Sequence, residues 1–342
     1  MHKLLYPPFV FHIAYLVLEM ATYDDVYTRV LEAYERISPF IEKTRVLRSD
    51  TLSEKFGCSI FLKMENEQRT GSFKLRGAFN KLSQNQNTEK SVVTSSTGNH
   101  GLACLDAMQK FNIKGKIVAP STISNVKREK LLAKGASLCL HGTDCEESEA
   151  YARQMSNSTN DIEYISPYND IDILAGQGTI AVEILNDIPN LDYIFLSVGG
   201  GGLMAGVAAY IKKVSPKVTI VGCQPEASPV MLESVKAGDI VEWDSKPTLS
   251  EGTAGGIEPG SITFPICRDL VDHWEVVEEK DIKWGIDHMW KTERSMVEGA
   301  AGMALAAVKN MSQDIKGKTV CVILCGGNID RDVVEEISSE FN

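Results

Sequence analysis

Strand-like and helix-like segments alternate along most of this chain, and this alternation restricts its fold more than any other feature. Short apolar runs such as residues 114–120 and 192–198 are typical of strands. Segments such as residues 100–111 and 203–214 instead repeat apolar residues at helical spacing. This order predicts an α/β protein in which helices wrap parallel sheets and ligands bind at the carboxyl ends of strands.

The N-terminal segment departs from this pattern. Residues 9–18, FVFHIAYLVL, are as apolar as the core of a signal peptide, but one lysine precedes them and LEMA (residues 18–21) is a poor cleavage site. The run is also shorter than the roughly 20 residues that span a bilayer. We expect the folded protein to begin near Met20 and residues 1–19 to form an N-terminal appendage outside the core.

Charge and cysteine content exclude several classes of protein. The net charge is -11, and acidic and basic residues are mixed along the chain, so there is no basic stripe for nucleic acid. The 8 cysteines are scattered without CxxC pairs, which argues against a zinc site or a disulfide framework. We therefore expect reduced thiols in a cytoplasmic protein that binds neither nucleic acid nor membranes.

The first of four unusual turns is TGSFKLRG, residues 70–77, which places Lys74 between two glycines at the start of a helix. Unpaired N–H groups and the helix dipole disfavour a cation there, and a lysine with a lowered pKa forms imines readily. Most single lysines near a helix start are nevertheless solvated surface residues, so Lys74 alone does not define a site.

The second turn is SSTGNHG, residues 95–101, between a strand and a helix. Its hydroxyls and backbone N–H groups converge as a carboxylate site requires. An ordinary helix N-cap is the alternative, but a cap explains one polar residue and not a run of them.

The third turn is SVGGGGLMAG, residues 197–206, whose consecutive glycines let the backbone approach a ligand and predict a phosphate cup before a helix. A dinucleotide fingerprint can also be fitted to Gly200, Gly202 and Ala205, with Glu226 as the ribose acceptor. That alternative, an NAD-dependent oxidoreductase, leaves Lys74 and the second turn without a function.

The fourth turn is LCGGNID, residues 324–330, where Cys325 follows an apolar strand. A single cysteine in this position is more often a small core residue than a functional one. Cys321, four residues earlier, is expected to serve in packing.

Taken in order, the motifs GSFKLRGA, SSTGNHG, AGQGT, VGGGGL and CGGN resemble those of the fold type II pyridoxal phosphate enzymes, and among them the serine/threonine dehydratase and serine racemase group. The resemblance implies a tryptophan synthase beta-like α/β fold of two three-layer domains with parallel sheets and the active site between them. A large domain would comprise residues 20–85 and 167–342, and a small domain residues 86–166. It also implies a homodimer and a possible cation site.

The resemblance further implies roles for individual residues. Lys74 would hold the pyridoxal 5'-phosphate as an imine and act as the base, and Thr97 would occupy the position of the acid on the opposite face. The residues implied in cofactor binding are Phe73, Lys74, Asn99, Gly199, Gly200, Gly201, Gly202, Leu203, Gly252, Glu298 and Cys325. The residues implied in binding the substrate carboxylate are Ser96, Thr97, Gly98, Asn99 and His100.

Three departures favour an L-serine/L-threonine ammonia-lyase, which acts on a small hydroxy amino acid, over a serine racemase. The racemases have a serine at the position of Thr97, and an amide where this chain has Tyr168. They bind a divalent cation through acids whose positions here are Gln224, Ser228 and Val230, so we expect no metal site. Serine racemase remains the alternative within the same family.

Overall fold

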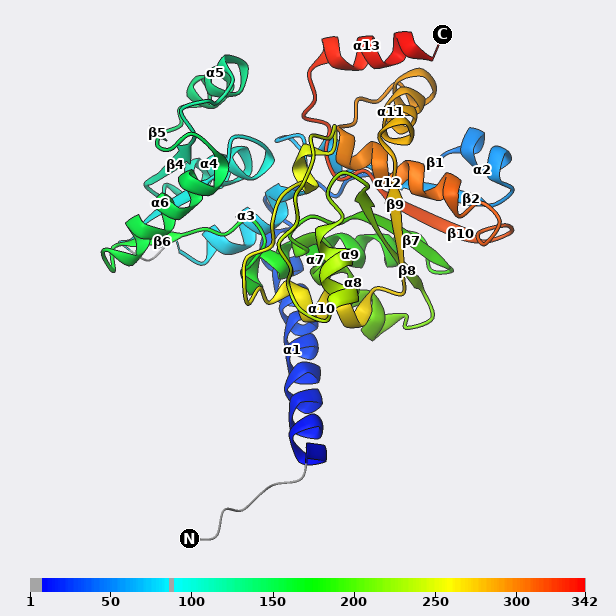
Figure 1. The fold of residues 1–342 in the computed structure, drawn as a ribbon, viewed down its shortest axis with the longest axis horizontal. Coiled ribbons are helices and arrows are strands. Elements are labelled where there is room, and N and C mark those ends of the chain that lie inside the picture. Colours follow the sequence, from blue (N-terminus) through cyan, green and yellow to red (C-terminus); the bar gives the residue numbers. More distant parts are fainter. Residues whose placement is uncertain (1–7, 86–88, 342) are drawn as a thin grey trace.

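Two mainly parallel β-sheets organise the chain in the computed structural model (Figure 1). The structure describes residues 8–85 and 89–341, with side chains from residue 23 onward except at 126. The larger sheet has the strand order β1-β2-β10-β7-β8-β9 and the smaller sheet the order β5-β4-β3-β6. The strands are β1 (Val46–Arg48), β2 (Ser59–Lys63), β3 (Ser91–Ser95), β4 (Gly115–Ala119), β5 (Leu138–Leu140), β6 (Ile162–Tyr164), β7 (Tyr193–Ser197), β8 (Thr219–Pro225), β9 (His273–Val277) and β10 (Thr319–Ile323).

Helices connect these strands, so that the chain reads as the predicted α/β alternation. The short 3-10 helices are η1 (Glu65–Glu67) and η2 (Glu251–Thr253), and a π-helical turn, η3 (Met289–Glu293), follows α11. The α-helices are α1 (Pro8–Ile37), α2 (Asp50–Phe56), α3 (Lys74–Ser83), α4 (Asn99–Phe111), α5 (Asn125–Ala133), α6 (Cys145–Asn157), α7 (Ile171–Asp187), α8 (Gly202–Val214), α9 (Val230–Ala237), α10 (Thr263–Leu270), α11 (Glu279–His288), α12 (Gly299–Asn310) and α13 (Arg331–Glu340).

The larger sheet is covered on both faces. After its first residue, every residue of β7, β8 and β10 is buried. Successive side chains of a strand point to opposite faces, so continuous burial requires packed helices on each side. Helix α8 packs on β7, and α12 packs on β7, β8 and β9. The antiparallel strand β1 and the edge strand β9 were not predicted from the sequence.

The smaller sheet is also sandwiched between helices. Val92 and Ile117 belong to a core shared with α3 and α4, whereas their neighbours Val93 and Val118 pack with Ala152 of α6. Figure 1 shows α4, α5 and α6 around this sheet, to one side of the larger sheet. We call residues 91–164 the small-sheet lobe. The domain boundaries implied by the resemblance stay a prediction.

Helix α7 begins before the AGQGT motif, residues 175–179. It starts at Ile171 because Asp170 caps it, accepting hydrogen bonds from the N–H groups of Asp172 and Ile173. The AGQGT motif therefore lies within a helix. A Cβ at Gly176 would lie 2.6 Å from the Cα of Gly77 on α3. The glycine thus allows α7 to pack directly against the helix that carries Lys74.

The structure describes only part of the predicted N-terminal appendage. Residues 1–7 of the predicted appendage lie outside the described residues, and α1 begins at Pro8, a proline position that suits the first turn of a helix. From Val26 onward, α1 contributes Val26, Val30 and Ala33 to the main core. Among the described helices, none is long and apolar enough to cross a bilayer.

A cluster of charged side chains is completely enclosed beside α3. Arg76 donates to both carboxylate oxygens of Glu65 at 2.7 and 2.8 Å and to those of Glu183 at 2.7 and 2.9 Å. Lys63 completes the cluster with a contact of 2.5 Å to Glu183. Burial by itself raises the pKa of the Glu65 carboxyl, but the Arg76 charge holds that pKa below its ordinary value. The cluster thus joins β2, η1, α3 and α7, and no local sequence pattern predicted it.

We expect Arg76→Met to lower the free energy of unfolding by about 3–5 kcal/mol, because it leaves two buried carboxylates with one cation. Urea unfolding of the apoprotein, followed by circular dichroism, measures this loss. Arg45→Met is the matched control, since the Arg45–Glu67 pair is 54% and 34% exposed and its removal should cost less than about 1 kcal/mol. Equal losses in the two variants would contradict this role of Arg76.

Candidate active site

Lys74 is the first residue of α3, as predicted, and it is partly buried. Its Nζ donates a hydrogen bond of 2.8 Å to the Pro167 carbonyl oxygen and lies 5.3 Å from the centroid of the Phe73 ring. Burial lowers the pKa of Lys74 from 10.5 to about 8. The lowered pKa was predicted, but its main cause is loss of hydration and not the helix dipole.

The glycine loop, residues 199–202, connects β7 to α8. Gly201 has a φ of 85°, in the left-handed region that favours glycine. A Cβ at Gly200 would lie 2.5 Å from the Tyr168 ring, and the Thr263 hydroxyl donates a 2.7 Å hydrogen bond to the Gly200 carbonyl oxygen. The loop is therefore a fixed, side-chain-free cradle before a helix N-terminus, where free N–H groups bind anions.

The turn before α4 is held by its own backbone. The N–H of Gly98 donates to the Ser96 hydroxyl at 3.2 Å, and a Cβ at Gly101 would lie 2.5 Å from the Ser96 carbonyl oxygen. A Cβ at Gly98 would meet no atom within 4 Å, so this side of the turn is open. Within the described chain, no hydrogen bond engages the Thr97 hydroxyl. The turn thus has the open side that the predicted carboxylate site requires.

His100 differs from the other residues of this turn because its imidazole is buried. Its Nε2 lies 3.2 Å from the Ile165 carbonyl oxygen and 3.5 Å from the Cys104 sulfur. Burial, together with the charge of Lys74, lowers the pKa of His100 to about 3, so the ring is neutral. We therefore expect His100 to meet a substrate carboxylate through its backbone N–H and not through its side chain.

Glu298 and Asn99 join the second and fourth turns. The Asn99 amide donates to both Glu298 oxygens, at 2.8 and 3.0 Å, and its carbonyl accepts a 2.7 Å hydrogen bond from Asn328. Burial raises the pKa of the Glu298 carboxyl, although the Asn99 hydrogen bonds oppose this. Asn99 is thus held in a fixed orientation at the start of α4.

Cys325 lies two residues beyond β10 and is buried. Its thiol points to the Ser197 hydroxyl at 3.9 Å, and that hydroxyl donates to the Ala300 carbonyl oxygen at 2.5 Å. Burial raises the pKa of the Cys325 thiol, so it is neutral at pH 7. Cys321 is fully buried in the main core, consistent with packing.

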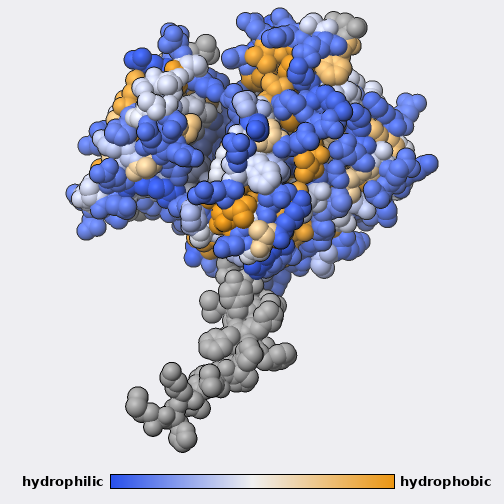
Figure 2. Space-filling model, viewed as in Figure 1, coloured by the Kyte–Doolittle hydropathy of each residue, from blue (hydrophilic) through white to orange (hydrophobic). Residues whose placement is uncertain are grey.

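The structure brings all four turns together. Tyr168, which packs on Gly200, directly follows the residue whose carbonyl accepts from Lys74. A Cβ at Gly199 would lie 2.9 Å from the Thr253 Cα, and one at Gly252 would lie 3.7 Å from Glu298. The charge of Glu298 raises the pKa of Lys74 and so opposes the effect of burial. Figure 2 shows a hollow between the small-sheet lobe and the surface near α11 and α13.

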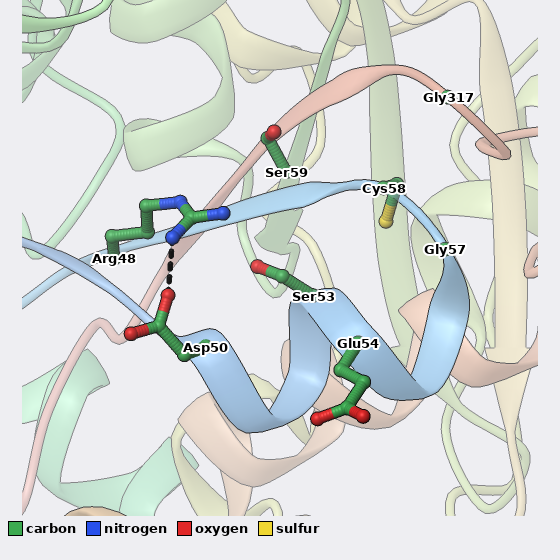
Figure 3. Close-up of a pocket in the computed structure, with 8 residues that line it drawn as sticks. All are labelled: Arg48, Asp50, Ser53, Glu54, Gly57, Cys58, Ser59 and Gly317. Carbon is green, nitrogen blue, oxygen red and sulfur yellow. Dashed lines mark hydrogen bonds and ion pairs between the residues drawn. The ribbon is translucent and has the colours of Figure 1, made fainter.

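Two other locations show less evidence of a functional site than the four turns do. A shallow pocket near β1 and α2 contains the exposed Arg48–Asp50 ion pair and shares no residue with the four turns (Figure 3). No group of three or more His, Cys, Asp or Glu residues spaced for a metal occurs in the described part of the chain. Gln224, at a position where the racemases have a cation-binding acid, is hydrogen-bonded to the backbone of Val198 and Leu232.

Fold and site together define an α/β enzyme with a desolvated amine nucleophile, an anion cradle and a neutral thiol. The pyridoxal-phosphate dependent enzyme family model matches residues 37–326, and the chain belongs to that family. This membership excludes the dinucleotide interpretation of the glycine loop and makes pyridoxal 5'-phosphate the cofactor.

Individual relatives agree with this assignment. An L-threonine ammonia-lyase of Thermotoga maritima is 36% identical over 93% of this chain and 78% of its own length. The processed threonine deaminase isoform 2 of Solanum lycopersicum has a TM-score of 0.86 at 29% identity, covering 92% of this chain and 93% of its own. The serine racemase of Dictyostelium discoideum has a TM-score of 0.82 at 31% identity, covering 89% and 98%.

The residues present fit the chemistry of this cofactor. Lys74 provides the amine that bonds its aldehyde, and the glycine loop offers backbone N–H groups and no side chains to its phosphate. Cys325 offers a neutral donor to its ring nitrogen, whereas the Asn99 amide, which the resemblance implies for its ring oxygen, donates to Glu298 in this structure. These individual roles remain predictions.

We expect Lys74 of the apoprotein to titrate near pH 8, because its buried ammonium form lacks water. Competitive acetylation across pH 6–11, with the label on each lysine quantified by mass spectrometry, measures this. The same lysine in urea-denatured protein is the control and should titrate near 10.5. A native midpoint near the control value would contradict the burial argument.

We expect Gly200→Ala to weaken pyridoxal phosphate binding by about tenfold or more, because the new methyl group would displace Tyr168 and the loop. Fluorescence titration of the apoprotein measures the affinity. Gly256→Ala is the control, since its Cβ would meet no atom within 4 Å and its φ is not in the left-handed region. Equal affinity in all three proteins would show that the loop does not form the cradle.

Proposed function

We propose that this chain is a pyridoxal-phosphate-dependent L-serine/L-threonine ammonia-lyase. The reaction removes the α-proton and β-hydroxyl of the amino acid, and water then replaces the nitrogen, giving a 2-oxo acid and ammonia. The observation that carries the proposal is the position of Lys74, a desolvated amine among the glycine loop, the open α4 turn and a neutral thiol. The printed functions of the lyase relatives support it.

Pyridoxal phosphate, when bound, withdraws electrons from the substrate and makes its Cα–H bond acidic. Lys74 is the group that takes this proton at Nζ, since its pKa near 8 leaves a substantial neutral fraction at neutral pH. Cys325 keeps its proton on Sγ and cannot place a negative charge beside the ring nitrogen. A neutral thiol at that position would make the bound cofactor a weaker electron sink, and this would favour rapid loss of the β-hydroxyl.

The substrate carboxylate binds, in this proposal, at the turn of residues 96–100. The N-terminus of α4 supplies N–H groups to it, and the space beside Gly98 admits it. Hydrogen bonds fix Asn99 before any substrate arrives, so little ordering is needed on binding. A small hydroxy amino acid meets these requirements.

Serine racemase is the second candidate function. By the resemblance, Thr97 would occupy the position of the acid that returns a proton to the opposite face. The racemase relative supports this alternative. Threonine adds a methyl group there, which we expect to disfavour proton return relative to elimination.

The cellular location and the oligomeric state belong to the same proposal. All eight cysteines are free thiols, which is typical of a reducing compartment and supports a cytoplasmic location. The resemblance to the dehydratase group supports a homodimer. Light scattering of the purified protein tests the assembly independently of activity.

We expect the purified holoenzyme to convert L-threonine and L-serine to 2-oxo acids with ammonia release, and to form D-serine more slowly. A coupled dehydrogenase assay measures the 2-oxo acid, and chiral chromatography measures D-serine. Lys74→Ala should lower the rate by about 10²–10⁴-fold while the circular dichroism spectrum stays unchanged. A predominance of D-serine would reassign the protein as a racemase, and the absence of both products would reject the proposal.

A further inference from the structure

We propose that Arg153 is a positioning residue that sets the enzyme's affinity for its amino acid. It does so by holding Glu258, and through Glu258 the ring of Tyr168, against the glycine loop. The proposal connects the small-sheet lobe to the active site through one ion pair. It rests on the proposed function only for the identity of the substrate.

Arg153 is oriented by the small-sheet lobe itself. Its Nε and Nη2 donate to Glu149, one turn earlier on α6, at 3.1 and 2.8 Å. Its guanidinium carbon lies 4.3 Å from the centroid of the Tyr164 ring on β6. Because both contacts come from within the lobe, the guanidinium is already aimed outward when it reaches Glu258.

Glu258 is where the lobe meets the rest of the chain. Its Oε2 accepts one hydrogen bond of 2.8 Å from Arg153 and another of 2.8 Å from the Asn169 amide. Its backbone N–H donates to the Tyr168 hydroxyl at 2.8 Å, and the N–H of Ile262 donates to Asn169 at 3.0 Å. Both ends of segment 258–262 are therefore tied to the Tyr168–Asn169 pair.

Tyr168 connects segment 258–262 to the candidate active site. A Cβ at Gly200 or Gly202 would lie 2.5 or 2.9 Å from Tyr168 atoms, so the side chain is in close contact with the loop. The preceding carbonyl, that of Pro167, accepts the hydrogen bond of Lys74. We therefore expect a displacement of Glu258 to move both the glycine loop and the Pro167 carbonyl that binds Lys74.

A second ion pair joins the same two parts of the molecule and provides a comparison. Lys127 of α5 contacts Glu251 of η2 at 2.9 Å, but these side chains are 46% and 75% exposed. Arg153 and Glu258 are only 32% and 26% exposed. Exposed pairs contribute little, whereas a partly desolvated guanidinium–carboxylate pair is stronger. We therefore expect the two pairs to differ in effect.

We expect loss of the Arg153–Glu258 ion pair to raise KM. Without the ion pair, a smaller fraction of enzyme has Tyr168 and the loop in place, and apparent affinity falls in proportion to that fraction. Saturating substrate still selects the competent arrangement, so kcat changes little. A purely structural role would instead reduce the amount of active enzyme and the thermal stability together.

The kinetic test compares holoenzyme variants with L-threonine as substrate. Arg153→Gln and Glu258→Gln should each raise KM by about tenfold with kcat changed by less than about threefold. Arg153→Lys, which keeps the charge, should recover part of the loss, and Lys127→Gln should match the wild type. Equal effects of Arg153→Gln and Lys127→Gln, or a loss confined to kcat, would overturn the proposal.

A second measurement needs no substrate. Amide hydrogen exchange of the holoenzyme should be about tenfold faster in segment 258–262 of Arg153→Gln than in the wild type, and unchanged there in Lys127→Gln. Unchanged exchange in Arg153→Gln would overturn the positioning role. Faster exchange in an enzyme that does not act on L-threonine or L-serine would support that role and reject the proposed substrate.

Discussion

The enclosed charge cluster around Arg76 is the constraint on which the rest of the structure depends. Two cations and two carboxylates, from β2, η1, α3 and α7, are almost completely removed from water, with exposed fractions of 0–3%. Desolvated charges are tolerated only when each finds a partner in good geometry, so these elements cannot shift independently. Arg76 is two residues after Lys74, and the cluster therefore fixes the first turn of the helix that carries the proposed catalytic amine.

Close helix contacts extend this constraint from Lys74 to the phosphate cradle. Gly77 of α3 meets Gly176 of α7, and Gly178 of α7 meets Gly206 of α8, where added Cβ atoms would lie 2.6 and 2.8 Å from the facing backbone. Helix α8 begins at the glycine loop. The two ends of the proposed cofactor site are thus connected through α7 by backbone contacts that leave no room for side chains to adjust.

Burial has one consistent effect on the groups of the site. It lowers the pKa of Lys74 and His100 and raises those of Glu298 and Cys325, so each shift favours the neutral form. A site of this kind suits proton transfer near neutral pH, because the acid and base forms of Lys74 are close in free energy. The carbonyl of Pro167 and the ring of Tyr168 supply the polar and apolar surroundings that this requires.

The α/β class, the start of α3 at Lys74 and the glycine loop before α8 could be predicted from the sequence alone, because helix periodicity and glycine runs are local signals. Strands β1 and β9 were missed, because β1 pairs antiparallel outside the strand–helix alternation and β9 lacks the continuous buried run of the central strands. Only the tertiary structure decided that Lys63 and Arg76 are enclosed, that the His100 ring turns inward, and that Arg153 meets Glu258. These depend on desolvation and on partners far away in the chain, such as Glu183 for Arg76, and no local pattern encodes either.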